Sequence, residues 1–185
     1  MEININQKKI SIGDKYQIFI DGTETNRAAA KIFKLFAEIN LFDINSDFPL
    51  ITIKRKFSFF KAKFDISKKE DIPYQFVTKS IWKGHFQCVC GADLYDIYSH
   101  RSRKHSIYKN DRQVAWWDQK AVTWFAGDNY TMIADKDCDK LLLISFCLAV
   151  DNYSNNDKKK GAINFNPGRL LAPQARAFDP NWMPK

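Results

Sequence analysis

A run of ten residues, Leu141 to Val150, limits what this chain can fold into. The run reads LLLISFCLAV, with one hydroxyl and no charge. Asp137 or Asp139 is suited to cap a helix at its start, and Asp151-Asn152 is suited to end one. A helix of this length covers about 15 Å, half of a bilayer's hydrocarbon core. We therefore predict a core helix at about 138–152, apolar on every side and buried in the protein itself.

Most of the chain before this run alternates apolar and polar residues with a period of two, which predicts strands. The clearest segment places Phe60, Ala62, Phe64 and Ile66 on one face, with Lys61, Lys63 and Asp65 on the other. Turn signals such as Asp21-Gly22 and Gly127-Asp128 separate the segments at a spacing typical of a sandwich or a barrel. The other predicted strands are 16–20, 33–41, 50–54, 74–82, 85–90, 94–99, 105–109, 113–117 and 129–133.

Residues 28–39 also fit a helical face, but the surrounding pattern favours a strand there. A flat sheet covers only one side of a helix, so a helix that is apolar all round requires a sheet that wraps it. We therefore predict a mostly β protein. It is a closed antiparallel barrel of about twelve strands around a central hydrophobic helix near the C-terminus, with no free sheet edges.

The chain carries a net charge of +8 and a pI near 9.3, which points to acidic partners: nucleic acid or anionic lipid headgroups. A charge spread over the surface for solubility explains these values equally well. The first residues, MEININQKKISIGDKYQ, contain no apolar core of a signal peptide, so we expect an intracellular, cytoplasmic protein with reduced cysteines. No apolar run is long enough to predict a transmembrane segment.

Three stretches resemble the tubby C-terminal-like superfamily, in particular its LURP-one-related proteins and phospholipid scramblases. Residues 39–56, INLFDINSDFPLITIKRK, are similar to a strand, an Asp-containing turn and a second strand of the family. Residues 74–117, ending in QVAWW, are similar to the paired strands of its second half. Residues 128–152, DNYTMIADKDCDKLLLISFCLAVDN, are similar to its last strand and core helix.

The resemblance covers about residues 10–153 and implies the same twelve-strand barrel, with no catalytic activity and no cofactor. Within the superfamily, tubby proteins bind phosphoinositides through basic surface residues and scramblases act at membranes. We accordingly divide the chain into a barrel at 1–153 and a tail at 154–185. Leu170, Leu171, Phe178 and Trp182 are large apolar residues of this tail, and they predict that it docks partly on the barrel.

A basic tract is the candidate ligand site. Lys54, Arg55 and Lys56 end one predicted strand, and Lys61 and Lys63 share a face of the next. If the two strands pair as a hairpin, these charges converge on one outer patch, where a phosphorylated headgroup would meet several charged donors. The competing interpretation is a solvated strand face whose lysines prevent misassociation. Arg101, Arg103, Lys104 and His105 form a second basic cluster.

Metal binding is less well supported. The acidic segment Asp128, Asp135, Asp137 and Asp139 lies where scramblases carry a calcium-associated segment, but helix capping explains Asp137 and Asp139. Cys88 and Cys90 share one strand face, which is poor geometry for zinc. Together with Cys147 they predict buried thiols and no metal site.

We find no motif for nucleophilic or metal-assisted catalysis, so no catalytic residue is assigned. The adjacent Trp116 and Trp117 would suit base stacking, yet they point to opposite faces of a strand and one of them belongs to the core. The sequence thus predicts a non-enzymatic protein at an anionic, phosphoinositide-containing membrane surface. A protein-interaction scaffold is the alternative, and nucleic-acid binding is third.

Overall fold

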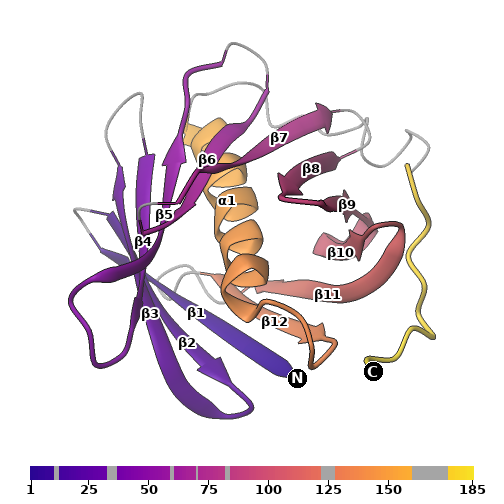
Figure 1. Ribbon diagram of the computed structural model, residues 1–185, viewed down its shortest axis with the longest axis horizontal. Helices are drawn as coiled ribbons and strands as arrows, with labels where there is room; N and C mark the ends of the chain where they lie inside the picture. The colour runs from indigo at the N-terminus through magenta and orange to yellow at the C-terminus, as the bar shows by residue number, and fades with distance from the viewer. Residues whose placement is uncertain are drawn as a thin grey trace.

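The computed structural model confirms the closed antiparallel barrel of twelve strands with a helix through its middle (Figure 1). It describes residues 1–10, 13–32, 37–58, 61–69, 71–81, 84–121, 128–159 and 175–185. Each strand pairs antiparallel with its neighbours in chain order, and β1 pairs with β12 to close the barrel. The strands are β1 (Glu2–Ile10), β2 (Gly13–Ile20), β3 (Thr23–Ile32), β4 (Ala37–Asp43), β5 (Pro49–Arg55), β6 (Lys63–Lys68), β7 (Tyr74–Ser80), β8 (His85–Cys90), β9 (Asp93–Ser99), β10 (Lys104–Lys109), β11 (Arg112–Ala121) and β12 (Asp128–Ala134).

Period-two alternation is the local cause of these strands, because every second side chain faces the barrel interior. In β4 the buried residues are Ala37, Ile39 and Leu41, with half-buried residues between them. The prediction of one strand over 28–39 is wrong, because the two ends of this segment belong to β3 and β4, which pair antiparallel with Ile32 opposite Ala37; residues 33–36 lie outside the described residues. Strand β1 was not predicted. Its inner row runs Ile3, Ile5 and then a buried Gln7, which interrupts the apolar pattern.

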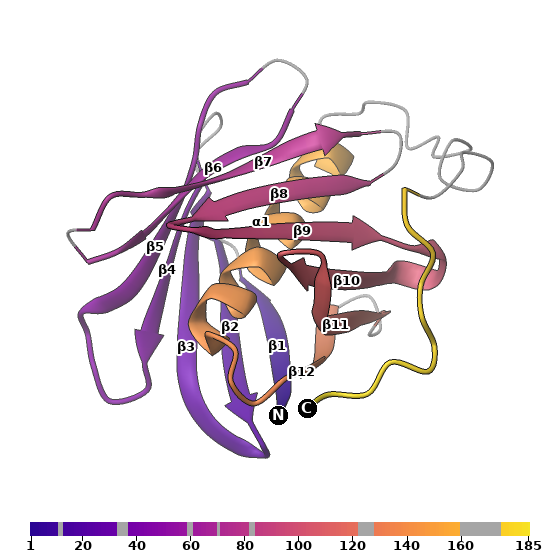
Figure 2. The same cartoon turned by 45° about the vertical axis from the view of Figure 1, so that its right-hand side comes forward.

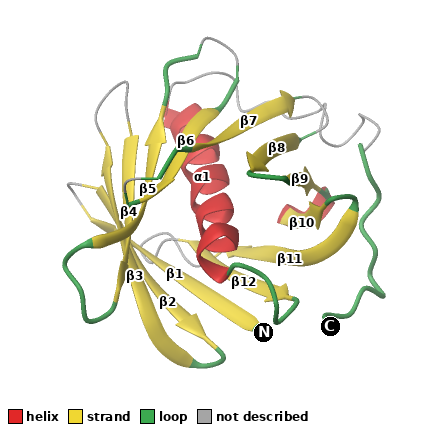
Figure 3. Cartoon of the chain, in the orientation of Figure 1, coloured by secondary structure: helices red, strands yellow, loops and turns green. Residues whose placement is uncertain are grey.

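The helix α1 spans Lys140–Lys159 and is enclosed by the strands on all sides (Figure 3). Its start is capped as predicted, since the Leu142 N–H donates to Asp139 Oδ1 at 3.2 Å. The ammonium of Lys68 in β6 binds the second oxygen of the same carboxylate, so one side chain fixes the helix start to the barrel wall. This hydrogen bond raises the pKa of Lys68.

The predicted end of the helix near residue 152 is wrong, because α1 continues to Lys159. Asp151 and Asn152 were read as a stop signal, but both are buried within the helix. The Asp151 carboxylate accepts hydrogen bonds from side chains of the barrel wall, so it needs no helix terminus or water to satisfy it. Helix α1 therefore crosses the predicted boundary at residue 153.

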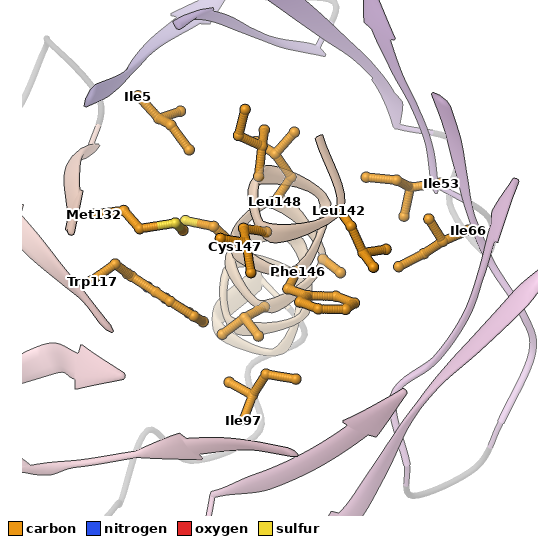
Figure 4. Close-up of a cluster of buried hydrophobic side chains, with 14 of the residues drawn as sticks. Ile5, Ile53, Ile66, Ile97, Trp117, Met132, Leu142, Phe146, Cys147 and Leu148 are labelled. Atoms are coloured by element: carbon orange, nitrogen blue, oxygen red, sulfur yellow. The ribbon is translucent and has the colours of Figure 1, made fainter. Parts of the chain in front are cut away.

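The core lies between α1 and the inner rows of the strands. Figure 4 shows Ile5, Ile53, Ile97 and Trp117 pointing from different strands toward the helix. Phe146 is fully buried at the centre, with its ring centroid 5.7 Å from that of Phe76 and 5.3 Å from that of Tyr95. The helix thus contributes its entire circumference to one core, which explains why its sequence has no polar stripe.

Residues 175–185 run along the outside of β9, β10 and β11 (Figure 2). Phe178 contacts the barrel there, and Trp182 is half-buried. Leu170 and Leu171, the other tail residues expected to dock, lie outside the described residues. The division into a barrel at 1–153 and a tail at 154–185 stays a prediction.

Replacing Phe146 with alanine should leave a cavity against both the helix and the barrel wall. We expect Phe146→Ala to lower the free energy of unfolding by about 3–5 kcal/mol in urea titrations. The matched control is Phe48→Ala, because Phe48 is 82% exposed and its truncation opens no cavity. Equal effects of the two changes would contradict the enclosed helix.

Candidate functional site

The two strands of the basic tract do pair as a hairpin. In the register of β5 and β6, Lys54 lies opposite Asp65 and Arg55 opposite Phe64. The Lys56 N–H extends the ladder by donating to the carbonyl of Lys63 at 2.7 Å. The charged residues of both strands are therefore held on one two-stranded ribbon.

Strand alternation separates Arg55 from the lysines. Ile51 and Ile53 of β5 face the interior, and Arg55 continues this inner row at the barrel end. Its guanidinium lies 6.0 Å from the ring centroids of Phe64 and of Tyr153 in α1. Arg55 thus covers the end of the core, and it does not join the outward-facing Lys54, Lys56, Lys61 and Lys63.

Two of the four outward lysines already have acidic partners. The Lys54 ammonium lies 3.7 Å from Glu38 of β4, and that of Lys56 lies 2.9 Å from Asp65. Both lysine side chains remain about half exposed, so these pairs weaken the local potential without closing the site. No ion pair joins Lys61 or Lys63 to an acid among the residues that the structure describes.

Lys79 is a further member of this site that the sequence did not reveal. The Thr78 N–H donates to the Ala62 carbonyl at 2.9 Å, and the Ala62 N–H donates to the Thr78 hydroxyl at 3.0 Å. These bonds set Lys61 beside Lys79 on the outer face of neighbouring chain segments. The alternation of β7 predicts that Lys79 faces outward, but only the register shows which residue lies next to it. We call Lys54, Lys56, Lys61, Lys63 and Lys79 the basic patch.

Apolar side chains accompany the basic patch. Phe57 follows Lys56 in the β5–β6 connection and is 58% exposed, and Ile81 follows β7 at 45% exposure. Both connections lie at the same end of the barrel, because β5 and β7 run in the same direction. Exposed large apolar residues beside lysines are typical of a surface that meets a partner.

The barrel ends differ in charge. Connections that follow odd-numbered strands lie at one end, which we call the basic end, and their described residues include Lys56, Lys61, Arg101 and Arg103 with no acidic residue among them. The opposite connections form the acidic end, where Lys69 and Lys136 are the basic residues among those described. Its carboxylates are Asp21, Asp47, Asp71, Asp111, Asp135, Asp137 and Asp139.

A model of the LURP-one-related family matches residues 1–151. The chain belongs to the LURP-one-related family. This family lies within the tubby-like superfamily, as the resemblance indicated. Comparisons with curated proteins and with solved structures give no match.

The LURP-one-related match ends inside α1, so the segment at 175–185 lies beyond it.

The second basic cluster is divided by the barrel wall. Lys104 lies over the ring of Trp116 on the outer face. His105 faces inward and stacks on the buried Trp117, with 4.5 Å between the ring centroids.

No described helix is long and apolar enough to cross a membrane.

The acidic segment does not form one cluster. Asp128 begins β12 at the basic end, while the other three aspartates lie beyond the opposite end of that strand. There, Asp135, Asp137 and Cys138 offer possible ligand atoms within 4.8 Å of one another. Arg112 already lies 3.3 Å from Asp135 and 4.0 Å from Asp137, and its guanidinium supplies the positive charge that a calcium ion would bring.

The cysteines are free thiols; Cys88 and Cys147 are buried as predicted, whereas Cys90 is half-buried. The sulfur atoms of Cys88 and Cys90 lie 3.5 Å apart on the inner row of β8. The hydrogen bond between the Cys88 and Cys90 thiols is the larger cause of a raised pKa at Cys88, and burial is the second cause; burial also raises the pKa of Cys147. Thiols with raised pKa values are poor nucleophiles and poor metal ligands.

A buried polar cluster surrounds Asp151 of α1. The Tyr16 hydroxyl donates to Asp151 Oδ2 at 2.8 Å, and the Tyr130 hydroxyl donates to Oδ1. The Gln7 amide lies 3.3 Å from the Tyr16 hydroxyl. Burial, and then the negative charge of Asp151, raise the pKa of both tyrosines well above the usual value. The cluster ties the helix to β1, β2 and β12.

These raised pKa values predict a loss of stability at high pH. The unfolded chain releases tyrosine protons near pH 10, whereas the folded chain holds them. The stabilisation that the protonated Tyr16 and Tyr130 contribute is therefore complete below pH about 10 and is lost at higher pH. We expect the free energy of unfolding to fall above pH about 10, and to fall less steeply in Tyr16→Phe. Chemical denaturation across this pH range measures both slopes. An unchanged slope in Tyr16→Phe would contradict the assignment.

Proposed function

We propose that this LURP-one-related barrel is a non-enzymatic protein that binds an anionic membrane surface through its basic end. The observation that carries the proposal is the coincidence of the basic patch with exposed Phe57 and Ile81 at one end, while carboxylates gather at the other. Such a charge distribution would orient the barrel in the field of anionic lipids.

The magnitudes favour combined electrostatic and apolar contacts. Five lysines against Glu38 and Asp65 leave three positive charges in the basic patch, and each contributes about 1 kcal/mol near an anionic leaflet. These three charges alone would give weak binding. Burying a Phe or Ile side chain adds about 1.5–3 kcal/mol, so insertion of Phe57 and Ile81 would bring the total into the range of stable peripheral association.

The headgroup contact is proposed to involve phosphates. Lys61 and Lys79 lie side by side, with Lys63 on the same outer face, so their ammonium groups can reach a common anion. Phosphoinositide headgroups carry several phosphates, and each contact with an ammonium is charge-assisted. Arg55 is not counted in the proposed contact, because its guanidinium lies over Phe64 and Tyr153.

Nucleic-acid binding has less support than a membrane surface. Base stacking requires accessible aromatic faces, but Trp117 is buried in the core. The ring of Trp116 is already in contact with Phe178 and lies beneath Lys104. Neither side chain offers an open stacking platform. The alternative that an observation still supports is a protein-interaction role, on the outer face of β11 where Phe178 contacts Trp116.

Vesicle co-sedimentation tests the proposal. The double variant Lys61→Gln/Lys79→Gln should weaken binding to phosphoinositide-containing vesicles by about 2 kcal/mol, roughly 30-fold. The matched control, Lys136→Gln/Lys140→Gln, removes the same charge at the acidic end and should bind as the wild type does.

Vesicles of neutral lipid, of neutral lipid with phosphatidylserine, and of neutral lipid with a phosphoinositide separate charge from headgroup selectivity. Preference for the phosphoinositide at equal vesicle charge would support recognition of the headgroup. Absence of binding to any anionic vesicle, or equal losses in the two double variants, would overturn the proposal.

A further inference from the structure

Strand β10 is buried on both of its faces. In the neighbouring β9 the burial alternates, but in β10 four consecutive residues, His105 to Tyr108, are buried. His105 and Ile107 face the interior, so Ser106 and Tyr108 must point outward. An outward row on a barrel wall is buried only where something covers it.

Phe178 provides part of this cover. Its ring centroid lies 5.3 Å from that of His100 and 5.7 Å from that of Trp116, both in edge-on geometry. The Lys104 ammonium lies 4.9 Å from the Phe178 ring and 5.2 Å from the Trp116 ring. A phenyl group is therefore held by two rings and a cation, which is a specific set of contacts for an aromatic side chain.

Arg176 makes a second specific contact. Its guanidinium lies 3.7 Å from the centre of the Tyr108 ring and pairs with the carboxylate of Asp111 in the β10–β11 turn. Stacking on an aromatic face combined with an ion pair is a geometry that arginine fills and lysine does not. The outer face of β9 to β11 thus carries one position for an arginine and one for an aromatic ring.

The two positions match the spacing of an extended chain. Arg176 and Phe178 are two residues apart, and Ala177 and Asp179 between and after them are exposed. Further anchoring comes from the main chain of Lys185, whose N–H donates to Asp135 Oδ1 at 2.7 Å. Arg176 and Phe178 make their contacts through side chains, so another segment with the same spacing could make those contacts.

We propose that the outer face of β9 to β11 is a recognition site for an extended segment of a partner protein that carries arginine and phenylalanine two positions apart. Residues 175–185 occupy this site in cis and gate it. The gate belongs to the same chain as the site, so it competes with a partner segment intramolecularly. A partner segment must displace it.

A labelled peptide with the sequence of residues 175–185 tests the site on the full-length chain by fluorescence anisotropy. The double variant Arg176→Ala/Phe178→Ala weakens the gate and should bind the peptide about tenfold or more tightly than the wild type. Met183→Ala is the matched control, since Met183 is 77% exposed, and it should bind as the wild type does.

The receptor side is tested by adding Asp111→Asn to the double variant. Asp111 is exposed and has a φ of 67°, a conformation that asparagine tolerates, so the fold is retained while the ion pair is lost. We expect weaker peptide binding than in the double variant, and no binding of a peptide with alanine at both recognition positions.

Two results would overturn the proposal. One is a peptide that fails to bind the gate variant, or that binds wild type and variant equally. The other is a wild-type dimer in light scattering that dissociates in Arg176→Ala/Phe178→Ala, because the occupant would then be the tail of a second copy.

Discussion

The enclosure of a helix that is apolar on every side is the constraint on which the rest of the structure depends. Phe146 and its neighbours can leave water only if strands surround them completely, and this forces the sheet to close. Closure as a simple antiparallel meander then sends every second connection to the same end of the barrel. One hydrophobic requirement thus decides which loops become neighbours.

Charge polarity follows from that topology. Lys56 and Lys61 are far from Arg101 and Arg103 in the sequence, yet connections after odd-numbered strands bring both pairs to one rim. Aspartates collect at the other rim, where Asp139 also caps the helix and binds Lys68. The proposed membrane surface therefore depends on the alternation of strand direction more than on any single motif. The proposed peptide site lies on the barrel wall and can operate independently of it.

Much of the fold was predictable from local pattern. Period-two alternation located most of the strands, and the all-apolar run identified the helix. The helix end and strand β1 were not found, for one shared reason. Gln7 and Asp151 look like polar interruptions, but they satisfy each other and Tyr16 inside the barrel, across a sequence separation that no local window covers.

The candidate site was predictable only in part. Sequence placed Lys54, Lys56, Lys61 and Lys63 on a common ribbon, because hairpin pairing is local. Arg55 faces inward because it follows Ile51 and Ile53 at intervals of two residues in β5, and these residues face the interior. Lys79 joins the basic patch because its neighbour Thr78 is in register with Ala62, and this register depends on the length of an intervening turn. The contacts of Arg176 and Phe178 required the three-dimensional arrangement of three strands.

The central claim is that the barrel meets an anionic membrane with its basic end, and immersion depth tests it most directly. A genetically encoded fluorescent amino acid would replace Phe57 in one protein and Phe48, at the acidic end, in another. With brominated lipids in anionic vesicles, we predict quenching of the label at residue 57 and none at residue 48. Equal quenching at both positions, or quenching at residue 48 alone, would contradict the proposed orientation.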